Sequence, residues 1–130
     1  MKTTVLVVDD SEMDRRLAAG LLKKETSVNV TFAADGREAL EKIAHHPPEI
    51  VVTDLQMPNM DGMEAIPFFR SQFPSCPVVV LTGAGTVENS SILFKQGVID
   101  FLSKPVDHER LLGAVKNAVS QSGYKDDYVT

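Results

Sequence analysis

The sequence has little cysteine, no long hydrophobic run and no excess of basic residues, and each shortage excludes a class of protein. A single cysteine, Cys76, cannot form an internal disulfide, and no zinc-ligand spacing surrounds it. No stretch approaches the ~20 apolar residues of a membrane-spanning helix, and the first residues lack the apolar run of a signal peptide. We therefore expect no membrane association and a location in the cytoplasm.

The charge balance is acidic, with 18 acidic against 13 basic residues and a net charge of -5. Such a chain offers no basic surface for the phosphates of DNA or RNA, so we expect no direct nucleic acid binding. The chain is 43% hydrophobic and 24% charged, which is typical of a folded protein. Its 130 residues fit one domain on the usual scale of roughly 100 to 200 residues per domain.

Short apolar runs alternate with helical patterns along the chain. The runs at 5–8, 50–52 and 78–81 are continuous and predict strands buried on both faces, whereas 28–32 and 99–102 include polar residues and suit peripheral strands. Five amphipathic helices are expected to follow these runs, with apolar faces formed by Met13, Leu17 and Leu21; Leu40, Ile43 and Ala44; Ile66, Phe69 and Phe73; Val87 and Phe94; and Leu111, Leu112, Val115 and Val119.

This alternation predicts an α/β fold, a doubly wound, flavodoxin-like (βα)5 parallel sheet with strand order 2-1-3-4-5. In such a sheet ligands bind at the carboxyl ends of the strands. We expect the domain to occupy residues 1–121, and the polar residues 122–130 to form a flexible tail or the start of a linker. Gly83, Ala84 and Gly85 predict a mobile loop before the fourth helix.

Polar side chains follow the strands that should meet at this edge of the sheet. Asp9 and Asp10 follow the first strand, Asp54 the third, Thr82 ends the fourth, and Lys104 follows the fifth. A lone aspartate after a strand most often caps the next helix. Two adjacent carboxylates, however, repel one another unless a cation lies between them, and an all-oxygen site without an EF-hand loop favours Mg²⁺. None of the three histidines falls at these strand ends, which argues against zinc.

Asp54 has two candidate roles at this edge. It can serve only as a third metal ligand, or it can also attack a phosphoryl group and form an aspartyl phosphate. The second role needs a metal ion and positive or hydrogen-bonding groups that spread the charge of the transferring phosphoryl group. Lys104 and Thr82 supply groups of this kind.

Four stretches of the chain resemble the receiver domain of two-component response regulators: VLVVDDS (5–11), VTDLQMPNMDG (52–62), VVLTG (79–83) and DFLSKP (100–105). The resemblance implies that Asp54 is the phosphoacceptor, that Asp10 binds Mg²⁺ directly and Asp9 through water, and that the backbone carbonyl of Gln56 completes the protein's metal ligands. It also implies that Lys104 contacts the phosphoryl group and that the Lys104–Pro105 peptide bond is cis.

The same resemblance implies a switch and its partners. The Thr82 hydroxyl would move toward the phosphoryl group while Phe101 rotates inward. The phosphoryl donor would be a sensor histidine kinase or a histidine phosphotransfer protein. The output would be a downstream domain or protein, or a homodimer, contacting helix four, strand five and helix five, where Ile92 and Ile99 add apolar surface. The chain would catalyse its own phosphorylation and dephosphorylation without turning over an external substrate.

Two alternatives stand beside this interpretation. One is a Mg²⁺-dependent phosphatase or hydrolase of similar topology, which would need an acidic residue two positions after Asp54, where this chain has Gln56. The other is an interaction module that is never phosphorylated, which the complete set of strand-end residues disfavours.

Overall fold

The computed structural model describes the backbone of residues 3–25, 27–83 and 87–129, and the side chains of these residues except 87 and 121–129. This part of the chain holds five strands that alternate with five helices: β1 (Thr3–Val8), α1 (Glu12–Leu22), β2 (Val28–Ala33), α2 (Gly36–His45), β3 (Ile50–Thr53), α3 (Gly62–Gln72), β4 (Val78–Thr82), α4 (Val87–Lys95), β5 (Asp100–Ser103) and α5 (His108–Val129).

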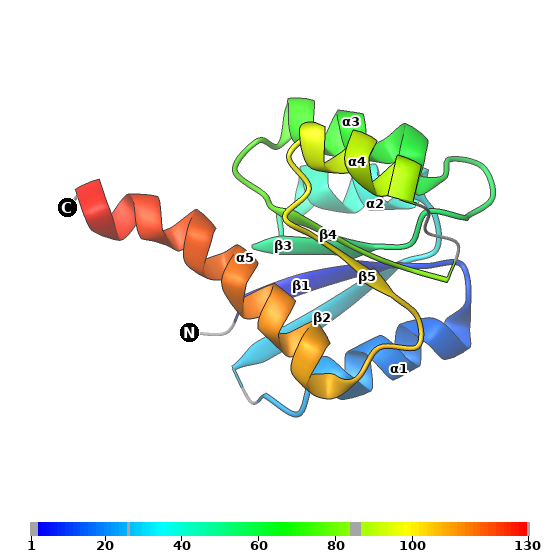
Figure 1. Cartoon of the computed structure of the whole chain (residues 1–130), viewed down its shortest axis with the longest axis horizontal. Helices are drawn as coiled ribbons and strands as arrows, with labels where there is room; N and C mark the ends of the chain where they lie inside the picture. The colour runs from blue at the N-terminus through cyan, green and yellow to red at the C-terminus, as the bar shows by residue number, and fades with distance from the viewer. Residues whose placement is uncertain (1–2, 26, 84–86, 130) are drawn as a thin grey trace.

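The strands form one parallel sheet in the order β2-β1-β3-β4-β5, which confirms the predicted fold. Helices α1 and α5 cover one face of the sheet, and α2, α3 and α4 cover the other (Figure 1). The three strands predicted to be central, β1, β3 and β4, are the central ones. Within the described ranges, no helix is long and apolar enough to cross a membrane.

Each face of the sheet has its own hydrophobic core. Strand β1 contributes to both cores because its side chains alternate: Val5 and Val7 pack toward α1 and α5, and Leu6 and Val8 pack toward α2, α3 and α4. Phe69 of α3 is the largest fully buried side chain among the described residues. Continuous apolar strands are therefore explained by burial on both faces.

The apolar face predicted for α1 is wrong at two of its three residues, Met13 and Leu17. Met13 is 72% exposed and Leu17 is 60% exposed, whereas Ala18, Ala19 and Leu22 are buried against the sheet. The four-residue spacing is present, but Met13 and Leu17 face solvent, and of the predicted face only Leu21 packs, partly buried, against the core. The two alanines have little side-chain volume, so the helix packs closely on the sheet through them.

Three further details differ from the sequence-based expectation. On α4, Leu93 is the buried residue and Phe94 is 48% exposed; the side chain of Val87 lies outside the described residues. Ala44 of α2 is exposed. The backbone of α5 continues as helix to Val129, past the end expected near residue 121. The division at 121 stays a prediction, and so does the mobile loop, because Ala84 and Gly85 lie outside the described residues.

The segment between β3 and α3 is shaped by close backbone contacts. A Cβ on Gly62 would lie 2.4 Å from the carbonyl oxygen of Asp54, so only glycine allows this approach. Asn59 has a positive φ of 65° and donates a 2.9 Å hydrogen bond from Nδ2 to Asp35. Asp61 caps α3 in a capping box with Glu64. These contacts hold the segment that follows Asp54 against the sheet.

Candidate functional site

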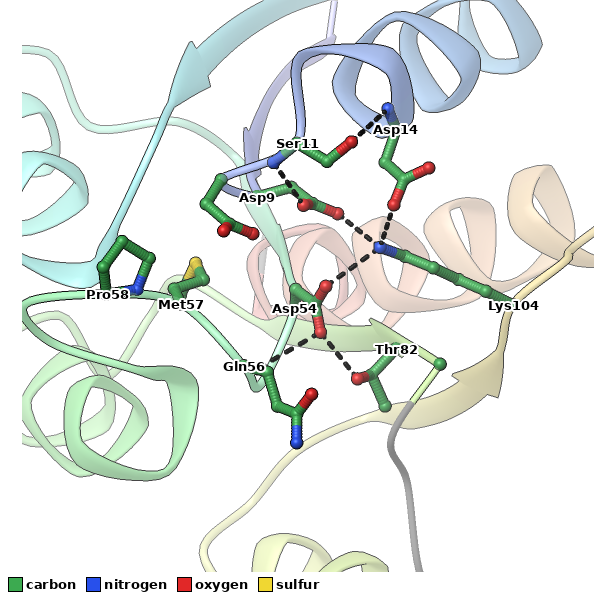
Figure 2. A pocket seen from close by; sticks show the side chains of 11 residues that line it. Asp9, Ser11, Asp14, Asp54, Gln56, Met57, Pro58, Thr82 and Lys104 are labelled. Atoms are coloured by element: carbon green, nitrogen blue, oxygen red, sulfur yellow. Dashed lines mark hydrogen bonds and ion pairs between the residues drawn. The ribbon is translucent and has the colours of Figure 1, made fainter.

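The carboxyl ends of the strands surround an open pocket of about 480 Å³. The predicted residues do meet there, although they come from distant parts of the chain: Figure 2 shows Asp54 at the centre with Asp9, Thr82 and Lys104 around it. The residues lining the pocket are Asp9, Asp10, Ser11, Asp14, Asp54, Gln56, Met57, Pro58, Thr82, Gly83 and Lys104.

Asp54 follows β3 directly, and its nearly buried carboxylate is held by four donors. Its Oδ1 accepts hydrogen bonds from the Thr82 hydroxyl at 2.6 Å and from the backbone N–H groups of Leu55 at 2.6 Å and Gln56 at 3.3 Å. Its Oδ2 lies 2.9 Å from Nζ of Lys104. Burial raises the pKa of Asp54, but the hydrogen bonds from Thr82 and Lys104 outweigh burial and leave the pKa below its usual value. The carboxylate is therefore ionised near neutral pH.

Lys104 follows β5, and its ammonium group contacts three carboxylates. Nζ lies 2.5 Å from Oδ2 of Asp9, 2.8 Å from Oδ2 of Asp14 and 2.9 Å from Oδ2 of Asp54. Burial lowers the pKa of Lys104, but the three carboxylates raise it by more, so the pKa lies above its usual value. The Lys104–Pro105 peptide bond is cis, as expected.

The acidic pair after β1 divides into one buried and one exposed residue. Asp9 is buried, accepts a 3.0 Å hydrogen bond from the Ser11 N–H on Oδ1, and has its pKa raised by burial despite the contact with Lys104. Asp10 is exposed. The two neighbouring carboxylates therefore differ in their access to solvent.

The carboxylates of Asp9, Asp10 and Asp54 could together hold a metal ion. Each offers an oxygen, and the three ligand atoms lie within 4.8 Å of one another; this is the one such group among the described residues. Oxygen-only donors with an open, water-accessible side suit a hard divalent cation that keeps several waters. The residues present therefore fit Mg²⁺, and the described histidines do not join them.

Phe101 lies on β5 next to the strand that carries Thr82. It is partly buried, packs against the core under α2, α3 and α4, and pairs with Val80 in the sheet register. Ile99 is also partly buried, against the opposite core, whereas Ile92 of α4 is 42% exposed. Of the two isoleucines expected to add apolar surface, Ile92 does so more clearly.

Two residues that contact the predicted site residues were missed by sequence reasoning, and both come from α1. Asp14 contacts Lys104, and Arg15 donates a 2.6 Å hydrogen bond from Nη1 to the backbone carbonyl of Asp9. Neither residue stands at a strand end, and charged residues in the first turns of a helix are common. The sequence therefore held no signal that separates them from solvated side chains.

Comparisons with known proteins agree with this geometry. The family model for the response regulator receiver domain matches residues 5–116. Protein PilG of Pseudomonas aeruginosa is 39% identical over 114 residues, which cover 86% of this chain and 84% of PilG. A putative NtrX-like response regulator of Rickettsia bellii is 32% identical over 96% of this chain, and the chain spans only 26% of that relative.

Solved structures give the same result. The signal receiver domain of a putative Luxo repressor protein from Vibrio parahaemolyticus superposes with a TM-score of 0.91, at 26% identity, over 97% of this chain and 96% of that one. NtrX from Brucella abortus superposes with a TM-score of 0.90 at 30% identity over 99% of this chain, which corresponds to 30% of that protein in its complex with ADP.

Proposed function

The chain belongs to the response regulator receiver domain family, and on this premise we propose that Asp54 accepts a phosphoryl group from the phosphohistidine of a sensor histidine kinase or phosphotransfer protein. The observation that carries the proposal is the position of the Asp54 carboxylate between a hydroxyl and an ammonium group, beside two further carboxylates. A nucleophilic carboxylate needs such neighbours to react with an anionic phosphoryl group.

The transfer uses the ionised form of Asp54. One carboxylate oxygen supplies the electron pair of the new O–P bond, and the electron pair of the breaking N–P bond returns to the imidazole nitrogen of the donor. Lys104 lies 2.9 Å from Oδ2 and is fully protonated, so it can neutralise charge on the phosphoryl oxygens. Thr82 offers a hydroxyl from the opposite side.

Asp9, Asp10, Asp54 and the backbone carbonyl of Gln56 would hold the Mg²⁺ ion that receiver domains bind. We assign the direct contact to Asp10, which is exposed, and the contact through water to Asp9, which is buried and engaged with Lys104. When bound, Mg²⁺ supplies positive charge that offsets the negative charge of the carboxylates and the incoming phosphoryl group.

The output of the reaction is a change at a protein-binding surface. Thr82 and Phe101 form the proposed switch, since Thr82 contacts Asp54 and Phe101 lies on the neighbouring strand. The surface proposed for a downstream domain or protein, or for a homodimer, is formed by α4, β5 and α5. We propose a cytoplasmic location for this domain. We do not propose that it binds nucleic acid directly.

The rival functions are less well supported. Receiver domains are generally not turnover enzymes, and Gln56 stands where a hydrolase would need an acidic residue. A module that is never phosphorylated would have no use for an ionised carboxylate held by a lysine and a threonine. Self-catalysed phosphorylation and dephosphorylation without an external substrate therefore remains our proposal.

Intact-protein mass spectrometry tests the proposal. The protein is incubated with Mg²⁺ and acetyl phosphate, beside an Asp54→Asn variant. We expect wild type to gain the mass of one phosphoryl group and the variant to gain none. An equal adduct on both proteins would show that Asp54 is not the acceptor.

A further inference from the structure

Asp14 is a pocket carboxylate that the strand ends do not account for. It lies in the first turn of α1, and its backbone N–H donates a 3.2 Å hydrogen bond to Oγ of Ser11, the residue that caps the helix. Its Oδ2 lies 2.8 Å from Nζ of Lys104. Figure 2 shows Asp14 reaching the ammonium group from above and Asp54 reaching it from below. The helix cap therefore fixes where this carboxylate meets Lys104.

The three N–H donors of the Lys104 ammonium group match three carboxylates, those of Asp9, Asp14 and Asp54. The Lys104 side chain is only 19% exposed, so solvent has limited access to replace a lost partner. Removing one carboxylate thus leaves one donor direction of the ammonium group without a fixed acceptor, and the flexible lysine stem can then move.

Asp14 differs from the other two partners in one respect. Asp9 and Asp54 belong to the acidic group that could hold a metal ion, and Asp14 does not. A divalent cation bound by Asp9 and Asp54 would offset part of the negative charge of these two carboxylates, so they would attract the Lys104 ammonium group less. The cation would also repel the ammonium group, because both are positively charged. Asp14 then remains as the partner whose charge is still available to Lys104.

We propose that Asp14 is a positioning residue for phosphoryl transfer, which holds the ammonium group of Lys104 beside Asp54 while Asp9 and Asp54 bind the metal ion. The inference rests on the proposed function and adds a residue to it. Asp14 acts through Lys104 and takes no part in bond making.

The test compares Asp14→Asn with Glu12→Gln in the full chain. Both changes remove one negative charge from the first turn of α1. Glu12, however, pairs with Arg16 at 2.9 Å, and its side chain is 68% exposed, so it serves as the matched control. Three quantities are measured with Mg²⁺ present: hydrogen exchange of the Lys104 ammonium group by ¹H–¹⁵N NMR, the rate of phosphorylation by acetyl phosphate, and Mg²⁺ affinity.

In Asp14→Asn we expect ammonium exchange to accelerate and phosphorylation to slow, each on the order of tenfold, because a hydrogen bond between two charged groups is replaced by a weaker one to a neutral amide oxygen. Mg²⁺ affinity should change by no more than about fivefold, as for removal of a nearby charge that is not a ligand. Glu12→Gln should match wild type in all three measurements.

The proposal is overturned if Asp14→Asn matches wild type in exchange and rate, or if Glu12→Gln reproduces both changes, since a general charge effect would then explain them. The proposed function fails separately, if wild type itself acquires no phosphoryl group. In that event the hydrogen exchange rate of the Lys104 ammonium group can still be compared between wild type and Asp14→Asn. This comparison decides whether Asp14 holds the ammonium group in place.

Discussion

The hydroxyl of Thr82 donates a 2.6 Å hydrogen bond to Oδ1 of Asp54 and thereby links β4 to the residue that follows β3. Thr82 is fully buried. Thr53 is buried as well and adjoins Asp54 in sequence, but its hydroxyl donates to the backbone carbonyl of Asp54 at 2.8 Å. Of these two threonines, only Thr82 contacts the carboxylate, so only Thr82 can respond directly to a group placed there.

This difference predicts unequal effects of Thr82→Val and Thr53→Val. Each change removes one hydroxyl and should cost about 1 kcal/mol of stability. Thr82→Val should reduce the response of β5 and α4 to beryllofluoride, a phosphoryl mimic, because the link from Asp54 to β4 is lost. Amide NMR spectra with and without the mimic measure the response. Equal losses in both variants would mean that the Thr82 contact does not carry the signal.

Phe101→Ala should also weaken the output while leaving phosphorylation of Asp54 intact. Phe101 is partly buried on β5 and lies outside the pocket lining. Typical couplings between sites are about 1 to 3 kcal/mol, so the mimic should change self-association or partner binding roughly 5- to 150-fold in wild type and less in the variant. Phe68→Ala is the control. It also truncates a phenylalanine, but Phe68 is exposed and lies on α3, outside the proposed output surface. Perturbed amides confined to the pocket and α1 would contradict the proposed output surface.

The two members of the acidic pair should differ in Mg²⁺ binding. Asp9→Ala removes a ligand that we assign to contact with the ion through water, and it should weaken binding on the order of tenfold. Asp10→Ala removes a direct ligand and should weaken it further. Titration of each variant with Mg²⁺, followed by amide chemical shifts, measures both affinities. An equal loss would mean that the direct and water-mediated roles are wrongly assigned.

Asp35 makes the stability of the fold depend on pH. It caps α2, accepting hydrogen bonds from the Glu38 N–H at 2.8 Å and from Asn59 at 2.9 Å, and these bonds lower its pKa below the usual 3.8. Folding thus favours the carboxylate, so its contribution is present above the usual pKa and is lost as the pH falls through the lowered value.

Asp35→Ala should therefore cost about 1 kcal/mol at pH 7, and the difference from wild type should shrink below pH 4. Asp35→Asn keeps a capping side chain without the charge and should depend less on pH. Urea unfolding at a series of pH values measures each free energy. A cost for Asp35→Ala that stays constant into the acid range would show that the ionised form is not what stabilises the cap.

The sequence predicted the sheet and the meeting of the strand ends for one physical reason. Continuous apolar runs show where buried strands end, and a parallel sheet brings those ends to one edge. The sequence alone therefore places Asp9, Asp54, Thr82 and Lys104 together.

The orientation of α1 could not be predicted in the same way. Met13 and Leu17 form a regular apolar stripe, but the helix packs on the sheet through Ala18 and Ala19. Periodicity shows that a helix has an apolar stripe, but it does not show whether the stripe faces the sheet or the solvent. That orientation depends on how the chain leaves β1. The contact of Asp14 with Lys104 depends on that direction too, because the two residues are 90 positions apart and meet only when α1 is docked.

Gly62 should tolerate no side chain, because a Cβ there would lie 2.4 Å from the Asp54 carbonyl oxygen and 2.9 Å from Cα of Leu55. Both are backbone atoms, so relief requires the residue that carries the reactive carboxylate to move. Gly62→Ala should destabilise the fold by about 1 to 3 kcal/mol and slow phosphorylation. Gly20→Ala, in the interior of α1 with nothing within 4 Å of the new methyl group, should instead stabilise it by roughly 0.5 to 1 kcal/mol. Urea unfolding of both variants measures the two free energies, and a Gly62→Ala protein as stable as wild type would show that the segment after Asp54 is not held by this close contact.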